Sequence, residues 1–381
     1  MKPHVAMILP DRIEHPVGGM GVQAKYLIEH LKKDFMFSVH GFPDETNLPY
    51  YHSVHNPLPK IQHGGVVTLT CQAAYLASIF KMVQEGKKPD LIHVLDYTEY
   101  IAGVYAAKAL NVPLVASMQL SAHLMHEANL WSARLPNSPD GVAIENSMRE
   151  MELLGLKEAD HVIHVSNVYK KIFSKIEGLD AKSTYIPNGV DLNEFKENQK
   201  TNLPGNGKRK IVFLGRFAPQ KNVASLLHAQ IPADIDLIFV GEKPNDPGML
   251  ELLSKRTENN PNIHYIGPAY GEEKVAILKS ADAVIIPSLH ECHPIVMHEA
   301  MAAGCVLIHS GAGDMQEILT DDFAINCGTN PETITNAIRI FASMRDEEIS
   351  VRKARGLEIV QDYTWKIAAE KTKLIYNTII K

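Results

Sequence analysis

Short apolar runs alternate with amphipathic stretches along almost the whole chain. Most runs are continuously apolar, which is typical of strands buried on both faces of a parallel sheet. The alternation predicts an α/β fold built from doubly wound parallel sheets. The predicted strands are residues 4–10, 35–42, 90–95, 113–118, 161–166 and 183–187, followed by 210–215, 235–241, 262–267, 283–287, 306–310 and 323–327. The predicted helices are 21–34, 99–110, 143–158, 249–256, 272–281 and 331–344, and residues 119–160 are the least regular part.

A polar segment divides this series in two. Residues 196–209, KENQKTNLPGNGKR, contain Gly and Pro and few apolar side chains, as expected for a linker. The length of 381 residues suits two or three domains. We therefore predict two Rossmann-like domains, residues 1–195 and residues 208–361, that create a deep cleft. Ligands of such sheets bind at the carboxyl ends of the strands, so functional residues are expected there.

Charge and cysteine content exclude several classes of protein. The 38 Lys and Arg residues against 44 Asp and Glu residues give a net charge of −6, which offers no general attraction for nucleic acid or an anionic membrane. No run reaches about 18 apolar residues, so no transmembrane helix is expected. The four cysteines form no C-x-x-C pair, and the N-terminus lacks the pattern of a signal peptide. A cytoplasmic protein is therefore predicted.

A glycine-rich loop, VGGMGVQA (17–24), follows the first predicted strand. Gly19, Gly21 and Ala24 formally match a dinucleotide-binding fingerprint. However, seven residues separate the strand from the glycines, and the second strand ends without the acidic residue that would hold a ribose. NAD-linked chemistry is therefore excluded. The loop can still bring bare N–H groups close to a phosphate or a sugar, or it can simply cap the helix.

A second candidate follows the strand KIVFL. Arg216 comes directly after Gly215, and Lys221 lies five residues further on, before a predicted helix. A forked guanidinium, a lysine charge and a helix N-terminus together suit a diphosphate. A solvated basic turn would show the same residues, but the place at a strand's carboxyl end favours binding.

The third candidate, SLHECHPIVMHEAMAAGCVLIHSGAG (288–313), is the most informative. Glu291 follows a strand and Glu299 lies eight positions later, on a helix that Pro294 can open. The two carboxylates can face one ligand from two sides, while the N–H groups of residues 293–296 can meet an anion or sugar hydroxyls. Two ordinary surface glutamates remain the simpler explanation. The nearby His and Cys residues do not have the spacing of a metal site, so no metal is predicted.

Taken in order, these motifs resemble those of the retaining glycosyltransferases of family 4, which have the GT-B fold. The resemblance spans most of the chain. The matching stretches are VGGMGVQAKYLIEHL (17–31), DLIHVLDYTEY (90–100), IPNGVDLNEF (186–195), LGRFAPQKN (214–222), HECHPIVMHEAMAAG (290–304), Gly311 with Gly313 and Glu317, and YTWKIAAEKTKLIYNTI (363–379). It implies that the last helix, residues 362–381, returns to the N-terminal domain.

The resemblance also implies roles for individual residues. Arg216 and Lys221 would neutralise the diphosphate of a nucleoside-diphosphate sugar, and Glu299 would bind its ribose. Glu291 would face the donor sugar and the charge that develops at the anomeric carbon. The remaining donor-binding residues would be Gly18, Gly19 and the backbone of His293, Pro294 and Ile295. No metal or other cofactor would be required, and the N-terminal domain would bind the acceptor.

Two positions depart from the family. Family members often carry a histidine where this chain has Gln119, which can hydrogen-bond a sugar hydroxyl but cannot carry a proton. His123 or His126 could supply an imidazole instead, as could His93 at the end of DLIHVL. The D-x-x-H-x-x-D pattern adds Asp96 to this acceptor side. The second departure is Ala312, where a glycine is common.

The predicted function is transfer of a hexose-type sugar, with retention, from a nucleoside-diphosphate sugar to an acceptor hydroxyl. The acceptor could be a glycan, a lipid-linked molecule or a small molecule, and no nucleic-acid partner is expected. The alternatives are a sugar-nucleotide epimerase, a glycan phosphorylase, for which no pyridoxal-phosphate lysine is evident, and a catalytically silent sugar-nucleotide binding protein.

Overall fold

The computed structural model describes residues 2–16, 18–55, 64–128, 130, 139–197 and 199–380. The chain forms two compact units. Unit 1 comprises Met1–Asn188 and Trp365–Lys381, and unit 2 comprises Gly189–Thr364. The chain thus enters unit 2 after Asn188 and leaves it after Thr364, whereas the sequence predicts limits at residues 195, 208 and 361. Val17 of the glycine-rich loop, Asn198 of the predicted linker and part of the irregular region 119–160 lie outside the described residues.

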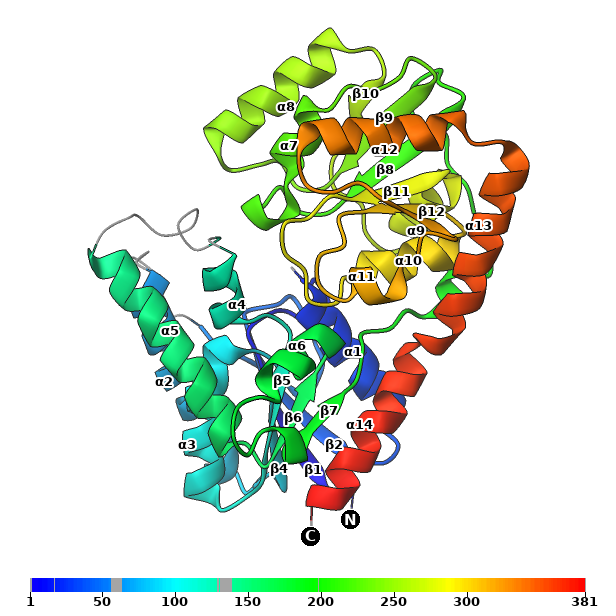
Figure 1. Cartoon of the computed structure of the whole chain (residues 1–381). Helices are drawn as coiled ribbons and strands as arrows, with labels where there is room; N and C mark the ends of the chain where they lie inside the picture. The colour runs from blue at the N-terminus through cyan, green and yellow to red at the C-terminus, as the bar shows by residue number, and fades with distance from the viewer. Residues whose placement is uncertain are drawn as a thin grey trace. The chain divides into compact units, whose positions relative to one another are not determined.

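Unit 1 contains a seven-stranded parallel sheet in the order β3-β2-β1-β4-β5-β6-β7 (Figure 1). The order reverses between β1 and β4, and such a reversal is where open α/β sheets bind ligands. The strands are β1 (His4–Leu9), β2 (Met36–Gly41), β3 (Tyr51–Ser53), β4 (Leu91–Val94), β5 (Leu114–Met118), β6 (His161–His164) and β7 (Ser183–Tyr185).

The helices of unit 1 include the last helix of the chain. α14 (Trp365–Ile379) packs against α1 (Gly19–Leu31), and the rings of Trp365 and Tyr26 stack at a centroid distance of 5.4 Å (Figure 1). A returning C-terminal helix is therefore present. The other helices are α2 (Gly64–Gln84), η1 (Tyr97–Glu99), α3 (Tyr100–Leu110), α4 (Ala122–Glu127), α5 (Pro139–Glu158), α6 (Asn167–Phe173) and η2 (Asp180–Lys182).

Unit 2 repeats the architecture with six parallel strands in the order β10-β9-β8-β11-β12-β13, which reverses between β8 and β11. The strands are β8 (Arg209–Leu214), β9 (Ile235–Val240), β10 (Ile263–Tyr265), β11 (Ala283–Ile286), β12 (Val306–His309) and β13 (Ala324–Asn326). The helices are η3 (Leu192–Phe195), η4 (Pro219–Lys221), α7 (Val223–His228), α8 (Pro247–Asn259), α9 (Gly271–Ser280), α10 (Ile295–Ala303), α11 (Met315–Ile318), α12 (Pro331–Ser343), α13 (Asp346–Ile359) and η5 (Val360–Asp362).

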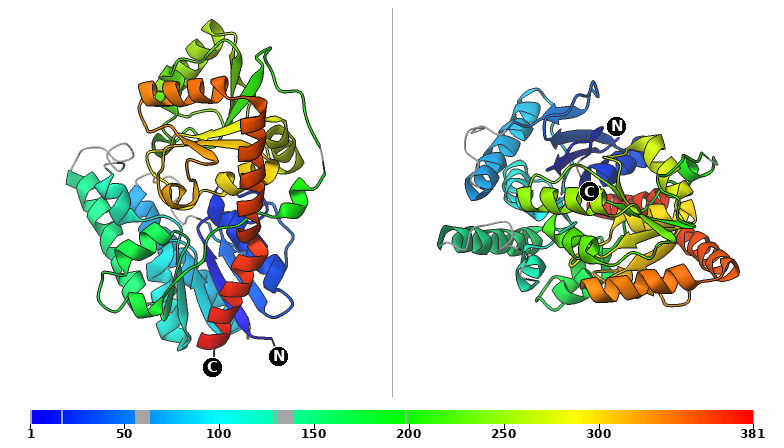
Figure 2. Two further views of the ribbon diagram at one scale, coloured as in Figure 1. Left: turned by 45° about the vertical axis from the view of Figure 1, so that its right-hand side comes forward. Right: turned by 90° about the horizontal axis from the view of Figure 1, so that it is seen from above.

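Successive residues of the unit 2 strands supply two separate apolar layers, because side chains alternate between the faces of a strand. In β8, Ile211 and Phe213 pack with α7, α8 and α12, whereas Val212 packs with α9, α10 and α11. Figures 1 and 2 show these helices on the two faces of the sheet. Burial on both faces explains why the strands are continuously apolar in the sequence.

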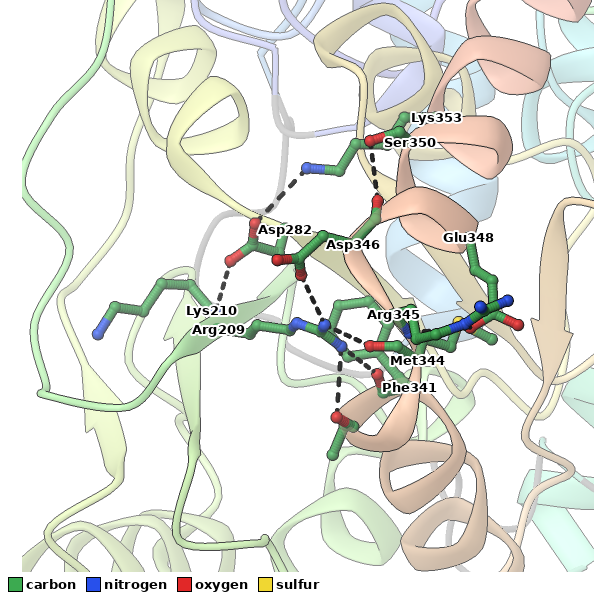
Figure 3. Close-up of polar contacts among 11 residues, drawn as sticks. Arg209, Lys210, Asp282, Phe341, Met344, Arg345, Asp346, Glu348, Ser350 and Lys353 are labelled. Atoms are coloured by element: carbon green, nitrogen blue, oxygen red, sulfur yellow. Dashed lines mark hydrogen bonds and ion pairs between the residues drawn. The ribbon is translucent and has the colours of Figure 1, made fainter.

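A buried arginine fixes the end of α12 to the sheet. Arg209 at the start of β8 donates hydrogen bonds to the carbonyl groups of Phe341 (2.7 Å), Ala342 (3.3 Å) and Met344, and to the Asp346 carboxylate (2.9 Å), as Figure 3 shows in part. Phe341 and Ala342 belong to the last turn of α12 and Met344 follows it; the Phe341 carbonyl also accepts the N–H of Met344 (3.2 Å), and Arg209 adds a charged donor where few backbone N–H groups remain. Arg209 therefore caps α12 and sets the corner before α13.

The doubly wound fold predicted from the sequence is confirmed, with strand limits within two residues of those expected. The prediction missed the three-residue strand β3, the helices α2, α4, α6, α11 and α13, and the first turn of α5. All four cysteines are buried and free of disulfides. Within the described part of the chain, no helix has both the length and the apolar character needed to cross a bilayer.

Candidate active site

The strongest candidate site in unit 2 lies where the strand order reverses, after β8 and β11. Gly215 and Arg216 follow β8, and Lys221 ends the short helix η4. The Lys221 ammonium donates a 2.6 Å hydrogen bond to Glu291, which follows β11. The two strand-end motifs found in the sequence are thus joined by an ion pair. Arg216 is exposed and forms no hydrogen bond or ion pair with any described residue, so its guanidinium is open to a ligand.

Glu291 is almost fully buried, with 8% of its surface exposed. Its Oε1 accepts hydrogen bonds from Lys221 and from the Ser288 hydroxyl, the latter at 2.6 Å. Asn222 stands next to Lys221 in a left-handed conformation, and its amide donates to the carbonyl groups of Pro287 (3.0 Å) and Thr329 (2.6 Å). The loops after β8 and β11 are therefore held together by side chains from both.

Glu299 lies on α10, which begins at Ile295 with Pro294 as its N-cap. Its carboxylate accepts a hydrogen bond from Lys274 of α9, and both side chains are largely buried. Burial lowers the pKa of Lys274, but the charge and the hydrogen bond of Glu299 outweigh it, so that the net pKa is raised. Sequence reasoning missed Lys274, because no local pattern links it to Glu299, 25 residues away.

His293 belongs to a buried polar chain. Its Nδ1 bonds to Asp314 (2.9 Å) and its Nε2 lies 2.6 Å from Nε2 of His298. The His298 ring is inaccessible to solvent and stacks on Tyr363 at 4.8 Å. Burial and the neighbouring His293 hold the pKa of His298 well below its ordinary value, so His298 is neutral. Sequence reasoning identified His293 only through its backbone and did not include Asp314 or Tyr363.

The glycine at 313 allows two loops to meet. Gly313 has φ +59°, and a Cβ atom there would lie 2.2 Å from the carbonyl oxygen of Glu291. Only glycine fits such a left-handed conformation at this distance. The next residue, Asp314, donates its N–H to the carbonyl of Cys292 (3.2 Å). The loop after β12 therefore supports the loop that carries Glu291.

In unit 1 the glycine-rich loop follows β1 and is organised by Asp11. One carboxylate oxygen of the buried Asp11 accepts hydrogen bonds from the N–H groups of Gly18 (3.0 Å) and Gly21 (3.1 Å). Gly18 is the N-cap of α1, and Gly19 is its first residue. A protein carboxylate thus already occupies part of this helix N-terminus, and the N–H of Gly18 is not open to a phosphate in this structure.

Two buried carboxyl groups follow β4. Asp96 is the N-cap of η1 and accepts hydrogen bonds from the N–H (3.1 Å) and hydroxyl (3.0 Å) of Thr98. Burial raises the pKa of Asp96 to about 7, although the bonds from Thr98 oppose the shift. Burial and the charge of Asp96 raise the pKa of Glu99 well above its ordinary value. At neutral pH this pair carries less than two negative charges.

Gln119 and His123 lie after β5 and are both oriented by other side chains. Gln119 donates to Gln23 of α1 (2.5 Å) and accepts from Asn188 (3.4 Å). His123, on α4, donates from Nδ1 to Glu152 of α5 (2.6 Å). Glu152 is fully buried and also accepts the backbone N–H groups of residues 122 and 123. A carboxylate that fixes an imidazole in this way sets its tautomer and leaves Nε2 as an acceptor.

His93 is placed differently from the sequence expectation. It is fully buried in β4, and both of its ring nitrogens are hydrogen-bonded, Nδ1 to the Tyr376 hydroxyl (2.6 Å) and Nε2 to the Ser117 hydroxyl (2.7 Å). Burial lowers the pKa of His93 to about 3. No ring nitrogen is left for an acceptor, so we place His93 in the core. His126, the other possible imidazole, is paired with Glu145.

Comparison with known proteins places these motifs in a family. The model of Glycosyltransferase Family 4 matches residues 17–194, and the model of Glycosyl transferases group 1 matches residues 194–355. Together they account for most of the chain, which belongs to the family 4 type of glycosyltransferases and has the GT-B fold of that family.

The curated relatives match over nearly the whole chain. An uncharacterized glycosyltransferase of Methanocaldococcus jannaschii is 25% identical, with 98% of this chain and 97% of the relative covered. A phosphatidyl-myo-inositol mannosyltransferase of Mycolicibacterium smegmatis is 27% identical, with 85% of this chain and 79% of the relative covered.

The solved structures agree on the fold. A sucrose-phosphate synthase from Thermosynechococcus elongatus has a TM-score of 0.81 at 20% identity, with 99% of both chains covered. HepE of Anabaena, in complex with UDP-glucose, has a TM-score of 0.73 at 17% identity, covering 98% of this chain and 99% of its own.

Proposed function

We propose that this glycosyltransferase moves a hexose-type sugar, with retention at the anomeric carbon, from a nucleoside-diphosphate sugar to an acceptor hydroxyl. The observation that carries the proposal is the contact of Lys221 with the buried Glu291, together with the exposed Arg216 five residues before Lys221. This arrangement lies after β8 and β11, where the strand order reverses and where such sheets bind ligands. The structure of HepE with UDP-glucose shows a protein of the same fold with such a donor.

The chemistry requires stabilisation of the departing diphosphate. Arg216 can bind its oxygens with a fork of N–H donors, and Lys221 adds a second charge. Preorganised charges of this kind are usually the largest catalytic contribution, because they need no rearrangement as the leaving group develops charge. We propose that these cations take the place that a metal ion has in other transferases. A rate unchanged by a chelator would agree with this, and a chelator-sensitive rate would contradict it.

Glu291 and Glu299 have separate roles in the proposal. Glu291 turns with Lys221 toward the loop after β8, and we assign it to the donor sugar and the positive charge at its anomeric carbon. Glu299 lies within α10, where Lys274 of α9 holds it, and we assign it to the ribose hydroxyls. The backbone of His293, Pro294 and Ile295 lies between the two carboxylates in sequence and would meet the diphosphate or the sugar.

We assign the acceptor to unit 1. His123 with Glu152, Gln119 and Asp96 offers hydrogen-bonding groups after β4 and β5, the strands next to the reversal of that sheet. These groups suit hydroxyls, and the acceptor class stays open among a glycan, a lipid-linked molecule and a small molecule. The relatives include phosphatidyl-myo-inositol mannosyltransferases and glycogen synthases, whose names cover a lipid and a glycan. A cytoplasmic location and the absence of a nucleic-acid partner remain predictions of the sequence.

The first experiment is a thermal-shift screen of the purified protein with UDP-, GDP-, ADP- and dTDP-sugars and the free diphosphates. A ligand that binds only the folded protein raises its melting temperature. We expect one nucleotide to give a shift that Arg216→Ala abolishes and that Lys208→Ala, a control at an exposed lysine before β8, preserves. No shift with any of them would contradict the proposal.

The second experiment uses the donor so identified. Glu291→Gln is expected to lower turnover about 100-fold while nucleotide affinity changes less than about threefold, since its proposed partner is the reacting sugar. The anomeric configuration of the product, read by NMR, tests retention. Incubation without an acceptor separates transfer from epimerisation, because an epimerase would convert the sugar nucleotide alone.

A further inference from the structure

Three side chains in and next to the donor loop, which we define as residues 287–294 between β11 and α10, form a continuous hydrogen-bonded chain. Asp314 follows β12, His293 precedes α10, and His298 lies within α10. All three are nearly or fully buried, with exposures of 1%, 3% and 0%. Buried polar groups of this kind lower the stability of the fold unless each is hydrogen-bonded, because they have lost their contacts with water. Such bonds hold the side chains in a definite geometry.

The order of donors and acceptors along the chain is fixed by Asp314. An ionised carboxylate can only accept, so His293 carries its proton on Nδ1 and presents a bare Nε2. His298 must then donate from its own Nε2 across the 2.6 Å contact. This leaves Nδ1 of His298 as a lone pair, and Nδ1 of His298 indeed has no hydrogen-bond partner among the described residues. A protonated His298 would bury an unpaired N–H, which agrees with its lowered pKa.

This hydrogen-bonded chain joins Glu291 and Glu299, the two carboxylates of the proposed site. His293 is two residues after Glu291, and His298 immediately precedes Glu299. Asp314 also holds the loop by its backbone, through the N–H that it donates to Cys292. A displacement of the His293 ring would therefore move the loop of Glu291 relative to the helix of Glu299.

At its His298 end, the hydrogen-bonded chain of side chains packs against the two segments through which the polypeptide enters and leaves unit 2. The His298 ring stacks on Tyr363, whose carbonyl accepts the N–H of Val190 (3.0 Å). Val190 and Thr364 form a parallel bridge. Val190 is the second residue of unit 2 and Thr364 is its last. The donor loop, α10 and these two segments are thus packed into one unit by side chains that take no direct part in the proposed binding.

We propose that Asp314, His293 and His298 are positioning residues that set the separation of Glu291 and Glu299 and so align the donor for transfer. The proposal rests on the proposed function, because it assigns the alignment of that donor. Displacing a reacting group by about 1 Å can cost about 100-fold in rate. Loss of this hydrogen-bonded chain is therefore expected to lower turnover more than the affinity for the donor, since Arg216, Lys221 and Lys274 remain.

The test compares wild type with Asp314→Asn, which keeps the shape and the backbone bond to Cys292, and with His298→Leu, which removes the last imidazole. For each variant, kcat is expected to fall at least about tenfold while KM for the donor stays within about threefold. His264→Leu is the matched control, because His264 pairs with Asp236 (3.3 Å) in the same unit and away from the donor loop. Wild-type kcat in both folded variants would overturn the proposal, as would a fall in kcat of the same size in the control.

A readout independent of activity keeps this proposal distinct from the proposed function. In protein labelled with ¹⁵N-histidine, NMR is expected to show His293 protonated on Nδ1 and His298 on Nε2. Amide hydrogen exchange of residues 291–293 and 295 is expected to accelerate in Asp314→Asn and not in His264→Leu. If the wild type turns over no donor, the proposed function fails. The NMR and hydrogen-exchange measurements then still test whether Asp314, His293 and His298 hold the loop in place. The opposite tautomers, or unchanged exchange in Asp314→Asn, would overturn it.

Discussion

The buried His93 makes the stability of unit 1 depend on pH in a way that can be calculated. Its pKa is about 3 in the folded protein and 6.5 as an unperturbed side chain. Between these values the unfolded chain binds a proton that the native state does not. The contribution of His93 to stability is therefore fully present above about pH 6.5 and is lost as the pH falls toward 3, by about 1.4 kcal/mol per pH unit.

At pH 5 the loss amounts to about 2 kcal/mol, which is a large fraction of the stability of an ordinary domain. We expect His93→Gln, which does not titrate, to be less stable than wild type at pH 7, because it loses packing and one hydrogen bond. The difference between the two proteins should shrink by about 2 kcal/mol between pH 7 and pH 5. His40, whose pKa burial also lowers to about 3, adds to the slope of both proteins equally and cancels in the comparison.

The assay is urea unfolding followed by tryptophan fluorescence. Trp365 is buried in unit 1, so its fluorescence reports on the unfolding of that unit. Tyr376→Phe is the control, because it removes one partner of His93 but leaves the imidazole buried, and its pH dependence should equal that of wild type. A wild-type minus His93→Gln difference that does not change with pH would refute the reasoning.

Three further predictions concern unit 2. Lys274→Met should raise the Kd of the nucleotide about tenfold, since Glu299 loses its cation. In isothermal titration, the double variant Lys274→Met with Glu299→Gln should bind the nucleotide about as tightly as Glu299→Gln alone. Arg209→Met should destabilise unit 2 by about 3 kcal/mol, seen as faster hydrogen exchange of α12, because carbonyl groups at its end lose a charged donor. Gly313→Ala should abolish nucleotide binding, whereas Gly271→Ala, with φ +50° and no atom within 4 Å, should cost only about 1 kcal/mol in thermal unfolding.

Much of the fold follows from the sequence because strands buried on both faces must be apolar throughout. Phe213 and Val212 face opposite layers, and both sides of the sheet demand the same kind of residue. The missed elements lack this signature. β3 is only Tyr51–Ser53 at the edge of the sheet, and its side chains are half-buried or exposed, so no apolar run marks it.

The donor site was predictable to the extent that its residues directly follow strands. Arg216 and Glu291 come after β8 and β11, and parallel strands bring such ends to one edge. Their partners were not predictable, because Lys274 and Glu152 lie 25 and 29 residues from the groups that they hold. His93 shows the converse error. A histidine near a strand end suggested chemistry, but its ring points into the core toward Tyr376, 283 residues away.

The same topological position holds cations in unit 2 and carboxyl groups in unit 1, and this supports the assignment of donor and acceptor. In unit 2 the reversal of strand order presents the open guanidinium of Arg216 with Lys221, which suits a diphosphate. In unit 1 the equivalent position holds the carboxyl groups of Asp11, Asp96 and Glu99. Asp11 already accepts the N–H groups of the α1 N-terminus, so a second anion there would meet a charge of the same sign.

The raised pKa values of Asp96 and Glu99 are a second difference between the carboxyl groups of unit 1 and the cations of unit 2. A protonated carboxyl group can both donate and accept a hydrogen bond, which suits a hydroxyl ligand and not a phosphate, and the raised pKa values favour that form. If unit 1 binds a neutral polyol, Asp96→Asn should leave acceptor KM within about threefold, because the amide also donates and accepts. Asp96→Leu should raise that KM at least about tenfold, since a buried hydroxyl left unpaired costs more than the lost contact. Equal effects of the two substitutions on KM would contradict this assignment.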